Sequence, residues 1–203
     1  MDARIDTSFQ TLQRDLFASG LAAEIGMNAF GVWLAIKTHA DYNTGEAWPG
    51  MRRLAHLTGL AVGSVQKGVH RLIDAHLLRV VKQAKGSNSR KGNTYIACER
   101  MDVRLGSRVL CTIVLDYVPA TLRQRIETIQ DGVRKGKPTG DIFADCVILP
   151  GPGFEWHAAS RSLRASIPIH DVPPAPLTET QLQSPMVQRL LEIQKNSRKR
   201  LKR

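Results

Sequence analysis

Trp48 to Tyr95 reads WPGMRRLAHLTGLAVGSVQKGVHRLIDAHLLRVVKQAKGSNSRKGNTY, and the spacing of its apolar residues determines the fold. Apolar residues three and four positions apart predict a short helix from Met51 to Leu57 and a second helix from about Val62 to Ala75. Leu77 to Lys82 is apolar and β-branched, as expected of a strand, and Thr94 to Cys98 predicts the return strand. The stretch therefore predicts two helices joined by a tight turn and followed by a hairpin.

Three residues support a specific crossing of the two helices. Ala55 is small enough to let two backbones approach, and Gly59, four positions later, can take the left-handed conformation that ends the first helix. Val65 follows six positions after Gly59 and points into the shared core. The predicted core consists of Leu54, Leu57, Leu60, Val65, Val69, Leu72 and Ile73. This order is that of a winged helix-turn-helix, in which one helix enters the DNA major groove.

The second helix is the candidate recognition helix. With its apolar side turned inward, the outward residues are Ser64, Gln66, Lys67, His70 and Arg71. Gln pairs with adenine, Arg and Lys pair with guanine, and Ser contacts phosphate. A solvated polar face is the alternative for any surface helix. We add Arg52 and Arg53, on the preceding helix, as candidate DNA contacts.

Two basic segments extend this prediction. The loop of the hairpin contributes Lys85, Asn88, Arg90 and Lys91 and has no acidic residue between 85 and 93. Such a loop can follow a phosphate backbone or place an Arg in the minor groove. The last nine residues contain six cations. Lys199 and Arg200 represent them among the candidate contacts, although a basic tail is often only solvated.

The distribution of charge favours a polyanionic partner. The net charge is +11, and it divides into −2 for residues 1–27, +6 for 28–99, +1 for 100–160 and +6 for 161–203. A basic excess confined to two regions is typical of nucleic-acid binding, because each neutralised phosphate releases counterions. A charge that served solubility alone would be spread more evenly.

The same four ranges define the expected organisation of an α+β protein. Residues 1–27 are a helical extension, with a short helix ending near Gly20. Residues 28–99 form the winged helix-turn-helix, opening with a helix from Asn28 to Ala40 that Asn28 caps. Residues 100–160 form a small α+β unit, with a strand at 109–115, a helix from Pro119 to Lys135 and a strand at 142–149. The composition changes beyond about Ala158, and residues 161–203 are expected to form a Pro-rich linker and a basic, largely disordered tail.

No pattern in the chain predicts catalysis or a cofactor. There is no phosphate-binding GxxxxGK[ST] loop, no HExxH pair and no CxxC spacing. Cys98, Cys111 and Cys146 lie in apolar runs and are expected to be buried thiols. We therefore expect a protein that is not an enzyme, has no metal and no cofactor, and does not bind a membrane. A cytoplasmic, nucleoid-associated protein of a prokaryote fits this composition.

The residues from Gly31 to Val80 resemble the winged-helix domains of phage and plasmid replication initiators and of related helicase loaders and transcription regulators. The resemblance is carried by Tyr42-Asn43, by Trp48, by the segment Gly59 to Val65 and by the Leu-Leu-Arg-Val run at 77–80. It covers about Phe30 to Ile96 and implies a DNA-binding module. Two departures matter, because Ala61 replaces the usual capping Ser or Thr and Gly68 interrupts the helix, each costing about 1 kcal/mol.

Three functions follow as hypotheses. The first is sequence-specific binding of double-stranded DNA by a replication initiator, or by a partner of one, from a plasmid or phage. The second keeps the same DNA contacts in a transcriptional repressor. The third is a protein-interaction scaffold with a nucleic-acid-binding tail. Homodimerisation and contact with the replication or transcription machinery are compatible with each of them.

The split charge leads to a prediction about the tail. Removal of residues 185–203 should lower the affinity for all DNA sequences alike and reduce the steepness with which binding falls as salt rises. Anisotropy titrations at several salt concentrations measure both quantities. An unchanged salt slope would show that the tail makes no contact with phosphate.

Overall fold

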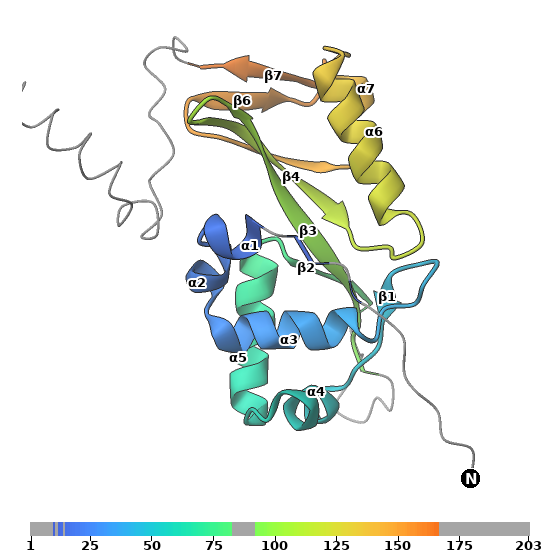
Figure 1. Cartoon of the computed structure of the whole chain (residues 1–203). Helices are drawn as coiled ribbons and strands as arrows, with labels where there is room; N and C mark the ends of the chain where they lie inside the picture. The colour runs from blue at the N-terminus through green and yellow to red at the C-terminus, as the bar shows by residue number, and fades with distance from the viewer. Residues whose placement is uncertain (1–9, 11, 14, 83–91, 167–203) are drawn as a thin grey trace, which may run out of the picture.

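The computed structural model describes residues 10, 12, 13, 15–82 and 92–166. Figure 1 shows α1 to α5 gathered at one end of the molecule and α6 and α7 at the other, with long strands running between them. The helices are α1 (Asp15–Ala18), α2 (Leu21–Ile25), α3 (Met27–Lys37), α4 (Met51–Thr58), α5 (Val62–Asp74), α6 (Leu122–Arg134) and α7 (Thr139–Ile142). The strands are β1 (Glu46–Ala47), β2 (Leu78–Lys82), β3 (Thr94–Leu105), β4 (Arg108–Asp116), β5 (Val147–Pro150), β6 (Phe154–His157) and β7 (Ser162–Ala165).

The predicted order of two helices, a turn and a hairpin is confirmed. α4 ends at Thr58, and Gly59 follows as its cap residue with a φ of 69°, the left-handed conformation expected there. β2 and β1 lie on opposite sides of the first part of β3, both antiparallel to it, with Leu78 opposite Ala97 and Ala47 opposite Tyr95. Helix α3, the pair α4–α5 and this small sheet form the arrangement of a winged helix-turn-helix. The β2–β3 loop, residues 83–91, lies outside the described residues.

One core joins these elements. Leu54, Val65, Val69 and Leu72 are buried as predicted, and Leu60 and Ile73 are partly buried against them. The prediction for Leu57 is wrong, because its side chain is 47% exposed. α4 is only two turns long and packs with α3 and α5 along the side that carries Leu54. None of the described elements covers the side that carries Leu57.

The start of the chain confirms one expectation and corrects another. The helix expected to end near Gly20 is α1, which ends at Ala18, and Gly20, with φ 82°, separates it from α2, a helix that was not predicted. The helix expected from Asn28 begins one residue earlier, and Gly26 occupies the cap position with φ 78°. Asn28 therefore lies in the first turn of α3, where its side chain makes no capping hydrogen bond.

β3 continues well past the predicted return strand. Residues 94–97 pair with the winged-helix strands, and residues 98–105 pair with β4, beginning with Cys98 opposite Asp116. β5 then pairs with the other edge of β4. The boundary proposed between residues 99 and 100 falls inside this strand, so that one strand belongs to the sheets at both ends of the molecule.

The second sheet has a small core of its own on one face. α6 and α7 cover this face, where Cys111, Ile113, Leu115, Ile129 and Phe143 are buried. The strand predicted at 142–149 is correct only for its end, because Thr139–Ile142 is helical and β5 begins at Val147. The hairpin of β6 and β7 was not predicted. The linker expected from about Ala158 is therefore wrong for its first residues, and the remainder, residues 167–203, is outside the described residues.

A buried ion pair connects the two ends of the molecule. Lys37, the last residue of α3, donates a hydrogen bond of 2.5 Å from Nζ to Oε1 of Glu99 in β3. The side chains are 0% and 2% exposed. The ammonium also lies 4.3 Å from the ring centroid of Trp33 and 4.1 Å from that of Tyr117. Burial lowers the pKa of Lys37, while the Glu99 carboxylate acts in the opposite direction.

The turn after α3 provides a second connection. Gly45 has φ 73°, and a Cβ placed on it would lie 2.3 Å from the carbonyl oxygen of Tyr117. Ala120 donates a backbone hydrogen bond of 3.0 Å to the carbonyl of Tyr42. The turn at residues 41–45 thus does more than end α3. It also brings the backbone of this loop against the segment that leads from β4 to α6.

The cysteines lie in or beside the sheet. Cys98 and Cys111 are buried and Cys146 is partly buried, and all three are free thiols. Burial raises the pKa of Cys98 to about 12 and that of Cys111 to about 11. These two thiols therefore remain protonated near neutral pH, which is consistent with a packing role.

Replacement of Lys37 tests the importance of the buried pair. The Lys37→Met variant leaves the Glu99 carboxylate buried without its cation, so the free energy of unfolding should fall by about 3–5 kcal/mol. The double variant Lys37→Met/Glu99→Leu should recover most of that loss. Urea denaturation measures both values.

A matched control is the exposed pair of Arg79 and Asp116, whose side chains are 50% and 35% exposed. Arg79→Met should cost only about 0–1 kcal/mol, because water can solvate the Asp116 carboxylate that remains after the change. An equal fall in the free energy of unfolding in Lys37→Met and Arg79→Met would show that burial does not make the Lys37–Glu99 pair more important than the exposed one.

Candidate nucleic-acid interface

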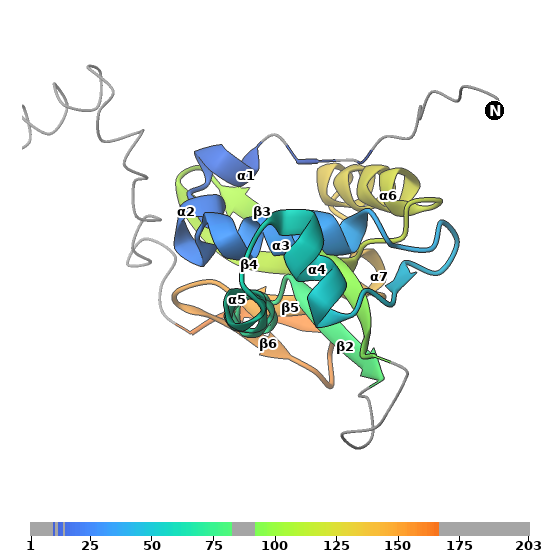
Figure 2. The ribbon, with the colours of Figure 1, turned by 90° about the horizontal axis from the view of Figure 1, so that it is seen from below.

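The surface of α5 is the centre of the candidate interface. Figure 2 shows this helix almost end-on, with α4 beside it. Val65, Val69 and Leu72 are buried, while Gln66, Lys67 and His70 are exposed on the other side of the helix. Sequence periodicity therefore predicted the exposed side correctly for these three polar residues. Ala61 occupies the cap position without a side-chain hydrogen bond.

The other two predicted contacts on α5 lie nearer to α3. Ser64 is partly buried, and Arg71 donates a hydrogen bond of 3.3 Å from Nη1 to the carbonyl oxygen of Ile25, the last residue of α2. Arg71 is exposed, but this contact holds its guanidinium toward the junction of α2 and α3. The five predicted contacts on α5 are thus not equally available to DNA, because the guanidinium of Arg71 already donates a hydrogen bond within the fold.

An open groove of about 450 Å³ runs between α5 and the start of α3. It is lined by Asn28, Ala29, Ser64, Lys67, Gly68, His70, Arg71 and Asp74. Asn28 and Ala29 belong to the first turn of α3, and helix N-termini attract anions. Asn28 was interpreted as a cap and not as part of a site. The groove is formed by two helices that cross, so no local sequence pattern could have indicated it.

Two arginines extend the surface along α4. Arg52 and Arg53 are both exposed near the start of this helix. Arg53 donates a hydrogen bond of 3.3 Å from Nε to Nε2 of His39, and the other ring nitrogen of His39 lies 2.8 Å from the carbonyl oxygen of Ala35. This arrangement requires the proton of a neutral His39 to be on Nδ1. His39 therefore orients Arg53, a role that the sequence did not reveal.

The base of the hairpin lies beside the start of α4. A Cβ placed on Gly92 would lie 3.8 Å from the Cα of Gly50, the cap residue of α4. Lys82, at the end of β2, is exposed and was not among the predicted contacts. The predicted contacts Lys85, Asn88, Arg90 and Lys91 in the loop, and Lys199 and Arg200 in the tail, lie outside the described residues.

The comparison with known proteins agrees with this arrangement. Residues 23–78 match a family model described as a helix-turn-helix domain, a class of DNA-binding domain. The match begins within α2 and ends at the first residue of β2, so that it includes α3, α4 and α5. This segment is a helix-turn-helix domain. Neither a curated protein nor a solved structure matches the chain.

Two features are absent from the part of the chain that the structure describes. None of the helices there is long and apolar enough to cross a membrane. That part of the chain also holds no group of three or more His, Cys, Asp or Glu side chains placed to bind a metal ion.

Gly68 has a packing role that its sequence position concealed. A Cβ at this residue would lie 3.3 Å from the Cα of Ala29 and 3.4 Å from Cγ2 of Val32, both in α3. The glycine thus lets α3 and α5 approach closely. Gly63, near the start of the same helix, is exposed, and a Cβ there would meet no atom within 4 Å.

The two glycines give a matched test of this packing. Gly63→Ala should raise the free energy of unfolding by up to about 1 kcal/mol, because alanine favours the helix and fits without contact. Gly68→Ala should not show this gain, since α3 must move to accommodate the methyl group. Thermal or urea unfolding measures the change in the free energy of unfolding for each variant. An equal stabilisation by the two substitutions would contradict the close approach.

Proposed function

We propose that this chain binds double-stranded DNA, with α5 in the major groove and the start of α4 and the β2–β3 hairpin on the backbone. The observation that carries the proposal is the exposed row of Gln66, Lys67 and His70 on the second helix of a helix-turn-helix domain. Arg52 and Arg53 are exposed on α4, which packs against this helix, and Lys82 is exposed at the end of β2. The protein acts by binding, without catalysis and without a cofactor.

The geometry suggests a division of roles among the contacts. Gln66 contacts a base edge, because it lies on the outer side of the helix and an amide can bond bidentately to adenine. Lys67 lies on the groove side of the same surface and contacts either a guanine or a phosphate. Ser64 and the first turn of α3 contact phosphate. Arg71 braces α5 against α2 and contributes mainly positive charge.

The biological process is proposed from the resemblance of residues 31–80 to initiator domains. The first candidate is a replication initiator, or a partner of one, on a plasmid or phage. The alternative is a transcriptional repressor with the same DNA contacts. A third candidate, a scaffold that binds protein through the helix-turn-helix domain, would not need polar contacts on the outer side of α5. Dimerisation would allow two half-sites to be read.

Substitution on α5 tests the proposed contacts. A duplex is first selected from a random library with the full chain. The double variant Gln66→Ala/Lys67→Ala should then bind it at least about tenfold more weakly, since one bidentate base contact is worth about 1–3 kcal/mol. Fluorescence anisotropy at fixed salt measures the affinity.

Arg123→Ala is the matched control. It removes one positive charge, as the double variant does, from an exposed position on α6 that is 92% exposed at the side chain. The affinity of the Arg123→Ala variant for the selected duplex should change little. Equal weakening by both variants would show that only the total charge matters, and selection of no duplex would argue against sequence-specific recognition.

The position of the bound sites in the genome distinguishes the two processes. Binding to an array of short repeats supports initiation, whereas binding across a promoter supports repression. Footprinting of bound sites by crosslinking in the native host gives this result directly.

A further inference from the structure

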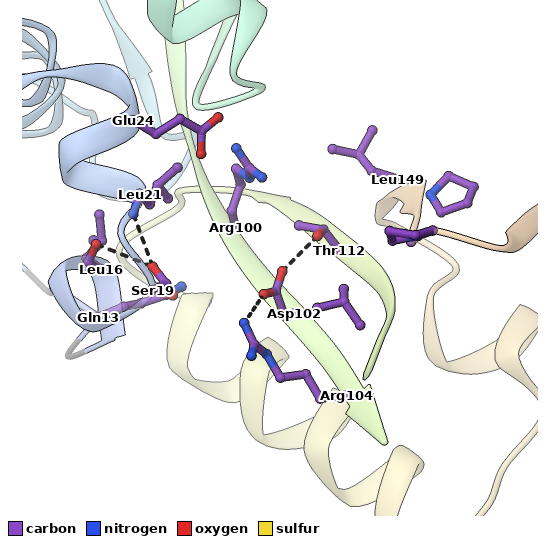
Figure 3. A pocket seen from close by; sticks show the side chains of 14 residues that line it. Gln13, Leu16, Ser19, Leu21, Glu24, Arg100, Asp102, Arg104, Thr112 and Leu149 are labelled. Carbon is purple, nitrogen blue, oxygen red and sulfur yellow. Dashed lines mark hydrogen bonds and ion pairs between the residues drawn. The ribbon is translucent and has the colours of Figure 1, made fainter. Parts of the chain in front are cut away.

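A pocket of about 380 Å³ lies on the face of the second sheet that is opposite to α6. Figure 3 shows β3 as its floor, α1 and α2 on one side and the end of β5 with the residues that follow it on the other. The segment of Leu149, Pro150, Gly151 and Pro152 lines the second side. The volume falls within the range of about 300–1,000 Å³ that small-molecule sites occupy. The helix-turn-helix contacts proposed above do not include this pocket.

Part of its polar lining is already satisfied. Asp102 accepts a hydrogen bond of 2.8 Å from Oγ1 of Thr112 and one of 2.6 Å from Nη2 of Arg104. These bonds, drawn as dashed lines in Figure 3, leave Asp102 and Arg104 as a neutral pair. The pair therefore contributes shape and polarity to the pocket and little net charge.

The side chains of Arg100 and Gln13 also line the pocket, and their hydrogen-bond donors are not taken up by Asp102. Arg100 donates from Nη1 to the carbonyl oxygen of Ala75 at 3.1 Å, and it forms no ion pair with a carboxylate of the described residues. The rest of its guanidinium can donate further hydrogen bonds. Nε2 of Gln13 is buried and has no hydrogen-bond partner among the described residues. A buried donor without an acceptor is costly. Because Nε2 of Gln13 is closed off from solvent, this side chain would have to turn toward the pocket to donate that hydrogen bond to a ligand.

The remaining lining is apolar on two sides. Leu16 and Leu21 come from the helical side, and Val109 and Leu149 come from β4 and β5. Glu24, exposed at the rim beside Arg100 in Figure 3, adds one negative charge. An anion with a single charge would pair with Arg100, whereas a second negative charge would face Glu24.

We propose that this pocket binds a small organic monocarboxylate with an aliphatic body. The carboxylate pairs with Arg100, an oxygen of the ligand accepts a hydrogen bond from Nε2 of Gln13, and the aliphatic part packs against Leu16, Leu21 and Leu149. The requirement for one negative charge and an apolar body distinguishes this ligand from inorganic anions and from dicarboxylates.

The pocket is connected to α5 through Arg100. Ala75, whose carbonyl accepts the bond from Arg100, is the cap residue at the end of α5. The neighbouring α2 also contacts α5, through the bond from Arg71 to Ile25. A ligand that recruits Arg100 therefore alters the support of the recognition helix. This regulatory consequence rests on the proposed DNA-binding function, whereas ligand binding to the pocket does not.

Hexanoate and hexanamide are a matched pair of probes for the full chain. They have the same aliphatic body, but only hexanoate carries the charge that Arg100 would pair with. Saturation-transfer NMR and calorimetry should show binding of hexanoate and at least about tenfold weaker binding of hexanamide. Equal affinities, or no saturation transfer to hexanoate at millimolar concentration, would overturn the proposal.

Two variants locate the binding. Arg100→Gln and Gln13→Leu should each weaken hexanoate binding by at least about tenfold, and Gln13→Leu keeps the proposal testable if loss of Arg100 impairs folding. Arg164→Gln, which removes a charge from exposed β7 outside the pocket, should bind hexanoate as the unmodified chain does. Loss of binding in the Arg164 variant, or full retention in Gln13→Leu, would place the ligand elsewhere.

Regulation is measured separately. Saturating hexanoate should shift the affinity of the chain for its selected duplex, as seen by anisotropy, and the same addition of hexanamide should not. An unchanged affinity with confirmed hexanoate binding would overturn the connection through Ala75 and leave the site standing. A chain that binds no DNA would overturn the proposed function, and the NMR result would still decide the pocket.

Discussion

The contact between Lys37 and Glu99 is the constraint on which the rest of the structure depends. It joins the end of α3 to the middle of β3, at the residue where this strand passes from the winged-helix sheet to the second sheet. An ammonium and a carboxylate that are this buried are tolerated only because each neutralises the other, and because Trp33 and Tyr117 present their rings to the cation. The pair therefore requires both ends of the molecule to be assembled together.

This constraint explains why the two parts do not behave as separate modules. A single strand, β3, contributes to both sheets, and the Gly45 turn lies against the backbone of Tyr117. The surface of α5 is held by this same framework, through close packing of Gly68 on α3 and through the bonds that Arg71 and Arg100 make to the backbone at its flanks. The candidate DNA-binding helix is thus supported by the second sheet as well as by its own domain.

The arrangement gives residues 100–160 a structural reason to be present. The face of their sheet that α6 and α7 cover is an apolar core, and the other face carries Arg100, Asp102 and Thr112 beneath the N-terminal helices. This polar floor with its apolar border is the basis of the ligand site proposed above. A pocket next to the end of α5 would let a small molecule influence DNA binding without occupying the DNA interface.

The sequence by itself determined the helix-turn-helix and its exposed side, because apolar spacing and Gly59 act within a few neighbouring residues. It predicted Gln66, Lys67 and His70 as exposed for the same reason. Only the tertiary structure decided the partner of Lys37, the close approach at Gly68, the bracing of Arg71 and the exposure of Leu57. Each of these depends on which distant element lies opposite the residue, and Lys37 and Glu99 are 62 positions apart. Local periodicity indicates which side of its own helix or strand a side chain lies on, but not which residues of other elements it contacts.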